Sequence, residues 1–100
     1  MFGMLGFLDM AGNYNERVVK NDKTDDFTLD TALVTDRSWR YETAVEHKDF
    51  NNGDWIVLEG ADTKEDAIKV HEKWLSKLAN NDVNELIDCY LGETYHRQKN

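Results

Sequence analysis

The chain has 100 residues, of which 40% are apolar, and this is enough for one domain with a hydrophobic core of its own. Its single cysteine, Cys89, excludes an internal disulfide framework and a cysteine-based zinc site. The formal net charge of −8 repels phosphate backbones, so direct nucleic-acid binding is not expected. The excess of acid either favours a basic protein partner or only confers solubility.

Residues 1–10 are mostly apolar, although Asp9 interrupts them, and they lack a basic leader. The stretch is too short to span a bilayer and no small-residue cleavage site follows it, so we expect no membrane association. Two interpretations stay open. The segment either packs on the core as a strand or strap, or it forms an arm that inserts into a partner.

Four segments of the first sixty residues have the composition of β-strands: 13–21, 27–34, 39–46 and 55–58. Apolar and polar residues alternate in the second and third segments, which predicts strands with one buried face. The third segment carries charge on its other face, whereas the fourth is continuously apolar and predicts a central strand. The sequence Asn51-Asn52-Gly53-Asp54 between them is typical of a hairpin turn.

A helix is predicted over residues 63–79. Thr63 and Asp66 form a capping box at its start. Its apolar stripe follows helical spacing and contains Ala67, His71, Trp74 and Leu78. We expect Trp74 to be largely buried against the sheet, and the other large aromatic residues, Trp39, Tyr41 and Trp55, are most simply core residues as well.

A second helix is predicted from a cap at Asp82 to a stop at Gly92, because apolar residues recur at i, i+3, i+4, i+7 and i+8 between them. Strands followed by helices predict an α+β domain over residues 1–92. We expect an antiparallel sheet of three to four strands, with the two C-terminal helices packed on one face. Residues 93–100 are expected to form a polar tail.

The sequence contains no catalytic or cofactor motif, so neither a cofactor nor a metal ion is expected. His71 lies on the apolar stripe, where a histidine is usually a core residue with one satisfied hydrogen bond. The alternative is that His71 meets His47, with Glu42 or Asp49, in a metal or acid–base site. Acidic residues between positions 22 and 30 look like a calcium loop only superficially, because the required glycine and terminal glutamate are missing.

Several segments of the chain share a pattern with a known group of proteins. Residues 39–47 read WRYETAVEH, residues 50–60 read FNNGDWIVLEG, residues 63–67 read TKEDA and residues 71–74 read HEKW. This pattern resembles a group of small uncharacterised proteins from tailed bacteriophages, with YETAV-x-H, YN-x-G-x-W and GH-x-x-W in the same order. The resemblance covers about residues 1–78 and implies no activity. Val70 stands where the group often has glycine, and Phe50 where it commonly has tyrosine.

These observations predict a non-enzymatic bacteriophage accessory protein that acts by protein–protein binding, in virion assembly or as a minor structural component. The candidate surface is the polar face of the third strand, with Arg40, Glu42 and Glu46 expected to be exposed. The expected partner is a phage virion protein or a basic host protein, in the host cytoplasm or in the virion. Two alternatives stay open: an acidic DNA-mimic-type inhibitor of a host defence protein, and a small enzyme that uses His47 and His71. The sequence leaves the oligomeric state open.

Overall fold

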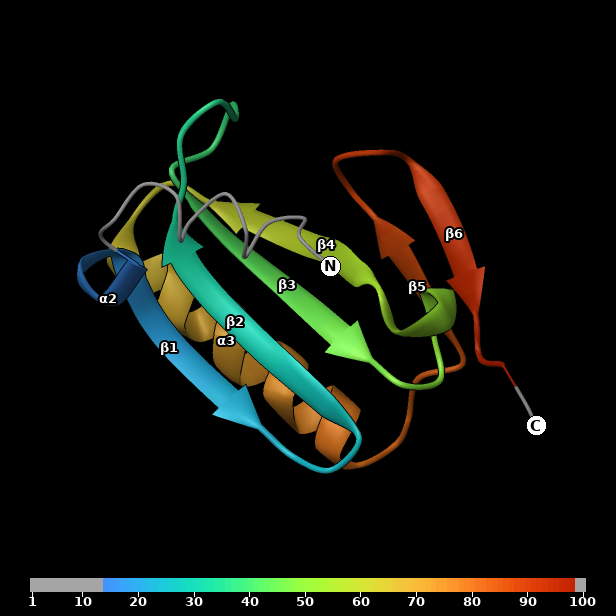
Figure 1. Ribbon diagram of the computed structural model, residues 1–100. Helices are drawn as coiled ribbons and strands as arrows, with labels where there is room; N and C mark the ends of the chain where they lie inside the picture. Colours follow the sequence, from blue (N-terminus) through green and yellow to red (C-terminus); the bar gives the residue numbers. More distant parts are fainter. Residues whose placement is uncertain (1–13, 99–100) are drawn as a thin grey trace.

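A computed structural model describes residues 14–98, so the expectations for residues 1–10 lie outside the described residues. The described chain is an α+β fold built from one four-stranded sheet, one two-stranded sheet and one long helix. In chain order (Figure 1), its elements are α2 (Tyr14–Arg17), β1 (Val18–Lys23), β2 (Phe27–Leu33), β3 (Tyr41–His47), the 3-10 turn η1 (Asn51–Gly53), β4 (Trp55–Ala61), α3 (Lys64–Ala79), β5 (Glu85–Asp88) and β6 (Glu93–His96).

The larger sheet is an antiparallel meander in the order β1-β2-β3-β4, which confirms the predicted antiparallel sheet. The turn between β3 and β4 forms where the sequence predicts it. Asn51, Asn52 and Gly53 have φ values of 53°, 54° and 82°, a left-handed conformation that asparagine and glycine tolerate best. The reversal places Val45 opposite Ile56 in the ladder.

The first strand differs from the prediction at both ends. Residues 14–17 are helical, and β1 runs from Val18 to Lys23. The turn between β1 and β2 is therefore short, and within it the hydroxyl of Thr24 accepts hydrogen bonds from the backbone N–H groups of Asp26 and Phe27, both at 3.1 Å. Asp22 consequently lies in a strand and not in a loop.

Helix α3 covers one face of the larger sheet (Figure 1). Its predicted cap is confirmed, since the Thr63 hydroxyl accepts a hydrogen bond from the Asp66 backbone N–H at 3.1 Å. The core between helix and sheet contains nine buried residues: Phe27, Leu29, Val45, Phe50, Ile56, Leu58, Leu78, Val83 and Leu86. Trp74 is only partly buried at the edge of this core, because its indole N–H reaches out to the Glu59 carboxylate at 3.0 Å.

The prediction of a second helix between Asp82 and Gly92 is wrong, and this segment contributes to the β5–β6 hairpin instead. The apolar residues of this segment have helical spacing, but they do not form one buried face, because Ile87, Tyr90 and Leu91 are exposed. Long-range contacts favour the strand. The Cys89 backbone N–H donates to the Val57 carbonyl at 2.9 Å, so the end of β5 is hydrogen-bonded to β4. The tail expected from residue 93 begins instead with strand β6, which pairs with β5.

Candidate functional site

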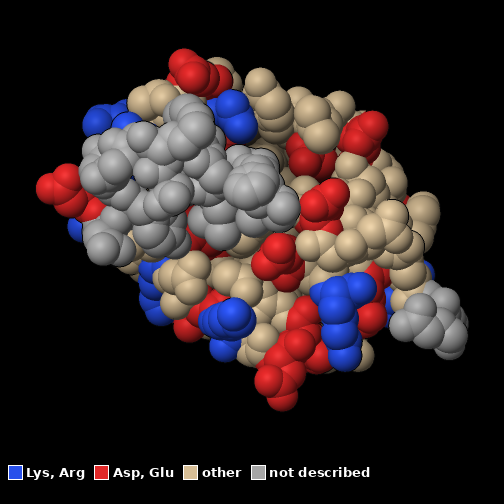
Figure 2. All heavy atoms as spheres, viewed as in Figure 1, with Lys and Arg blue, Asp and Glu red and all other residues tan. Residues whose placement is uncertain are grey.

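Charged side chains of both signs are interspersed on the face of the molecule that Figure 2 shows. Four acidic side chains are paired with basic ones, at 2.6–2.8 Å: Glu72 with Lys20, Asp26 with Lys48, Glu59 with Lys73, and Asp49 with Arg97. These pairs offset part of the negative net charge locally.

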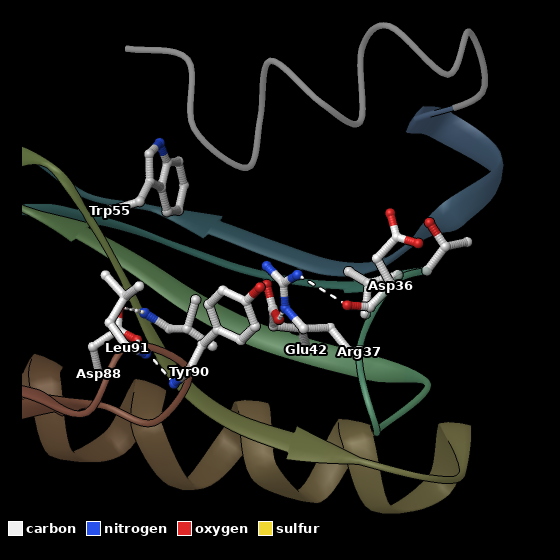
Figure 3. A pocket seen from close by; sticks show the side chains of 10 residues that line it. Asp36, Arg37, Glu42, Trp55, Asp88, Tyr90 and Leu91 are labelled. Carbon is white, nitrogen blue, oxygen red and sulfur yellow. Dashed lines mark hydrogen bonds and ion pairs between the residues drawn. The ribbon is translucent and has the colours of Figure 1, made fainter.

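A pocket of about 390 Å³ lies between the larger sheet and the turn that joins β5 to β6. It opens on the sheet face opposite α3. Thr43 belongs to the hydrogen-bond network of His71 on α3, and adjacent strand residues point to opposite faces, so Glu42 points away from the helix. Ten described residues line the pocket (Figure 3): Val34, Thr35, Asp36, Arg37, Glu42, Trp55, Val57, Asp88, Tyr90 and Leu91. Its size is at the lower end of the range typical of ligand sites.

Glu42 is buried in the wall of this pocket, with 1% of its surface exposed. The expectation that it is exposed is therefore wrong. The bend before β3 folds back over the strand, so that Arg37 Nε donates to Glu42 Oε1 at 2.8 Å and Trp39 Nε1 donates to the same oxygen at 3.1 Å. The other carboxylate oxygen, Oε2, is buried and has no hydrogen-bond partner among the described residues.

The other two residues of the predicted surface are not joined to Glu42. Arg40 is exposed in the bend before β3, and its guanidinium lies 6.0 Å from the centre of the Tyr41 ring. Glu46 is half-buried near the other end of β3, opposite Trp55 in the ladder. The predicted surface is therefore divided, with Glu42 in the pocket and the other two residues outside its described lining.

Asp88 fixes the turn that forms the outer wall of the pocket. Its Oδ1 accepts hydrogen bonds from the backbone N–H groups of Tyr90 at 2.9 Å and Leu91 at 2.7 Å, and its Oδ2 accepts one from Val57 at 3.1 Å. The turn presents Tyr90 and Leu91 with 52% and 61% of their surfaces exposed. The Arg37 guanidinium lies 3.7 Å from the centre of the Tyr90 ring, so this pair stands at the opening (Figure 3).

Two further groups near the pocket bear on its chemistry. The indole Nε1 of Trp55 is buried and lacks a hydrogen-bond acceptor within the described part of the chain. Burial, with the nearby carboxylates of Asp88 and Glu42, raises the pKa of the Cys89 thiol above its ordinary value. That thiol is therefore protonated near neutral pH and is a poor nucleophile.

His71 is fully buried beneath the sheet, as expected of a core histidine, but it has two hydrogen bonds and not one. Its Nδ1 lies 2.7 Å from the Thr31 hydroxyl, which lies 2.6 Å from the Thr43 hydroxyl, and its Nε2 lies 2.8 Å from Asp22 Oδ2. One proton arrangement satisfies every member: Nε2–H donates to Asp22, Thr31 donates to Nδ1, and Thr43 donates to Thr31. Since Thr31 is 0% exposed, its hydroxyl cannot reach a substrate in this conformation.

His47 occupies a different environment. Its ring stacks on Phe27 with centroids 5.8 Å apart, meets Phe50 edge-on at 5.1 Å, and accepts a hydrogen bond from the Asp49 backbone N–H at 3.0 Å. Burial lowers its pKa below the ordinary value. The structure thus gives the two histidines separate partners, and residues 14–98 contain no group of three or more His, Cys, Asp or Glu side chains that could hold a metal ion.

Sequence reasoning missed most of the pocket because it assigned the hairpin to a helix. One local signal was available. Asp88 is followed four residues later by Gly92, which has a φ of 75°, and an aspartate with a glycine beyond it is typical of a tight turn. No signal in the sequence indicated that Arg37 and Trp39 would close over Glu42, because that contact depends on how the bend folds back.

Comparisons with protein-family models, with curated proteins and with solved structures find no match. Within the part of the chain that the structure describes, no helix has the combination of length and apolar character that crossing a membrane requires.

Proposed function

We propose that the chain is a non-enzymatic bacteriophage accessory protein that binds another protein through the pocket and the exposed turn beside it. The phage context comes from the sequence pattern of residues 39–74, and it favours virion assembly or a minor structural role. The partner is a phage virion protein or a basic host protein. The observation that supports binding at this place is the exposure of Tyr90 and Leu91 at the opening of the pocket.

Exposed apolar side chains at the rim of a hollow are typical of protein-binding sites. Tyrosine is enriched among the residues that dominate interface energies, since a large ring loses little conformational freedom on binding. The turn is also held in place before any partner arrives, because Asp88 binds two of its backbone amides. A preformed turn lowers the entropy cost of association.

The distribution of charge supports this proposal better than a DNA mimic. A DNA mimic needs a row of free carboxylates at phosphate-like spacing, whereas basic side chains are interspersed with the acidic ones on the face in Figure 2. The lysine and arginine partners of Asp26, Asp49, Glu59 and Glu72 reduce their field further. The remaining net negative charge is still suited to steering a basic partner toward the pocket.

The test is affinity capture from phage-infected cells with wild-type protein and two matched variants. Leu91→Asp places a charge at the rim, and Ile68→Asp places the same charge at an exposed apolar position on α3. Mass spectrometry identifies the captured protein, and calorimetry with that purified protein gives the affinity. We expect Leu91→Asp to weaken binding at least about tenfold, which is the loss typical of a residue at the centre of an interface, and Ile68→Asp to have no effect. Equal binding by all three proteins would refute the proposed surface.

A further inference from the structure

We infer that the pocket binds a lysine side chain of the partner protein. This inference rests on the proposed function and names the chemistry that its pocket recognises. The starting observation is the Glu42 carboxylate, which is 1% exposed and whose Oε2 has no hydrogen-bond partner among residues 14–98. A buried carboxylate oxygen without a donor is unfavourable, and a bound molecule that supplies a donor removes this penalty.

The charges of the described lining residues favour a cation. They comprise three carboxylates, from Asp36, Glu42 and Asp88, and one guanidinium, from Arg37. Arg37 is bound to Glu42 Oε1, and the Asp88 oxygens accept bonds from backbone amides, which carry no formal charge. The pocket therefore has an excess of negative charge, and a positively charged side chain complements it.

The geometry of Glu42 favours an ammonium group over a guanidinium. A guanidinium binds a carboxylate best as a fork that uses both oxygens. Oε1 of Glu42 already accepts two hydrogen bonds, from Arg37 and Trp39, so one oxygen remains. An ammonium donates from a single point and needs one such oxygen, while the apolar walls at Val57 and Leu91 suit the methylene stem of lysine.

Trp55 supplies a reporter of binding in the pocket. Its buried indole Nε1 is a donor without an acceptor among the described residues, and Trp55 also lines the pocket. Figure 3 shows the indole nitrogen directed away from Glu42, so Trp55 reports on a ligand in the pocket by proximity and does not itself bind the lysine. The occupant is a protein side chain and not a free amine, because the proposed function places a partner protein at the exposed turn beside the pocket.

The lysine reaches Glu42 when the Tyr90 side chain at the opening moves, while Arg37 stays bound to Oε1. In the observed conformation the carboxylate is closed to solvent, and Arg37 and Tyr90 are stacked beside it (Figure 3). Tyr90 belongs to a turn and is 52% exposed, whereas the Arg37 side chain is only 20% exposed. Exposed side chains change rotamer rapidly, and such changes are common when an interface forms.

The test is a titration of the full chain, labelled with ¹⁵N, with three tripeptides capped at both ends: Gly-Lys-Gly, Gly-Arg-Gly and Gly-norleucine-Gly. The indole N–H signal of Trp55, assigned with Trp55→Phe, reports binding. We expect the lysine peptide to shift this signal and to bind at least about tenfold more tightly than the norleucine peptide, because a hydrogen bond to a charged group is lost. The arginine peptide should bind more weakly than the lysine peptide. Glu42→Gln should abolish the preference, whereas Glu46→Gln, on the same strand outside the described lining, should retain it.

Equal affinity for the lysine and norleucine peptides would overturn the inference, and this comparison needs only wild-type protein if Glu42→Gln fails to fold. A Trp55 signal that shifts with protein concentration in the absence of peptide would identify a second copy of the chain as the occupant and would also overturn it. Binding of the captured partner to the variants distinguishes the lysine pocket from the proposed function. Binding that is lost in Leu91→Asp but unchanged in folded Glu42→Gln would refute the lysine pocket and leave the proposed function standing.

Discussion

The buried chain of hydrogen bonds beneath α3 can be tested with Thr31→Val, a substitution that removes one hydroxyl and leaves the volume nearly unchanged. Thr31 is 0% exposed and lies between Thr43 and His71, with hydroxyl contacts of 2.6 Å and 2.7 Å. Valine has the same branched shape, so the substitution creates no cavity. The measured change in stability therefore reports the hydrogen bonds and not the packing.

The expected loss follows from which groups are left without a partner. In the variant, Nδ1 of His71 loses its donor and the Thr43 hydroxyl loses its acceptor, and His71 cannot switch tautomer without turning an unprotonated Nε2 toward the Asp22 carboxylate. Each buried group left unsatisfied costs about 1–3 kcal/mol. The two together predict a loss of about 2–6 kcal/mol in the free energy of unfolding. Thr43→Val removes only the terminal donor, so it should cost less, about 0.5–1.5 kcal/mol.

Urea denaturation of wild type, Thr31→Val and Thr43→Val measures these differences, with Thr28→Val as the matched control. Thr28 lies on the same strand but is half-buried and projects from the other face. Its replacement should change stability by less than about 0.5 kcal/mol. A loss of about 3 kcal/mol corresponds to a drop of about 12–24 °C in Tm for a domain of this size. A Thr43→Val loss equal to or greater than that of Thr31→Val would refute the proposed direction of the hydrogen bonds.

Three further predictions concern single side chains. Trp74→Ala should lower stability by about 2–3 kcal/mol in a urea melt, less than a fully buried tryptophan would, because Trp74 is only partly buried and bonds to Glu59 at its edge. Burial holds the pKa of His47 below 6.5, so the unfolded chain binds a proton first as the pH falls. The stability from keeping His47 neutral is thus present above about pH 6.5 and decreases as the pH falls toward the folded pKa. Thermal melts should therefore give a lower stability at about pH 5.5 than at about pH 7.5. The His47→Phe variant should show a smaller difference between the two pH values. Gly92→Ala should cost about 1–2 kcal/mol in thermal melts, since a Cβ there has open space but φ is 75°.

Local signals in the sequence predict the strands of the larger sheet and α3, but the prediction that residues 55–58 form a central strand is wrong, because β4 lies at the edge of that sheet. The alternation in residues 27–34, the glycine turn before β4 and the capping box at Thr63 each depend on residues close together in the chain, and each places an element that the structure contains. The prediction of a single buried face is wrong for β2 and β3, whose middle residues are buried on both faces. Local signals do not predict the β5–β6 hairpin. Residues 83–91 fit helical spacing, but contacts with Val57, which is distant in sequence, decide their conformation. Local preference is weak where an element is completed by tertiary contacts.

The candidate site could be predicted only in part, for a similar reason. Glu42 is correctly placed on the face of β3 that points away from the helix, but alternation along a strand does not indicate what covers that face. The covering residues, Arg37 and Trp39, come from a bend whose path has no periodic signal. The partners of His71 are equally distant in sequence, since Thr31 is separated from it by 40 positions.

The way Asp88 holds its turn has a consequence for engineering. The three hydrogen bonds that its carboxylate accepts all come from main-chain amides, those of Val57, Tyr90 and Leu91, so the loop geometry does not depend on the side chains that the loop carries. Positions 89, 90 and 91 can therefore be randomised together, with Asp88 and Gly92 kept constant, to give a display library on a folded scaffold. Selection from such a library would change what the protein recognises without redesigning its core.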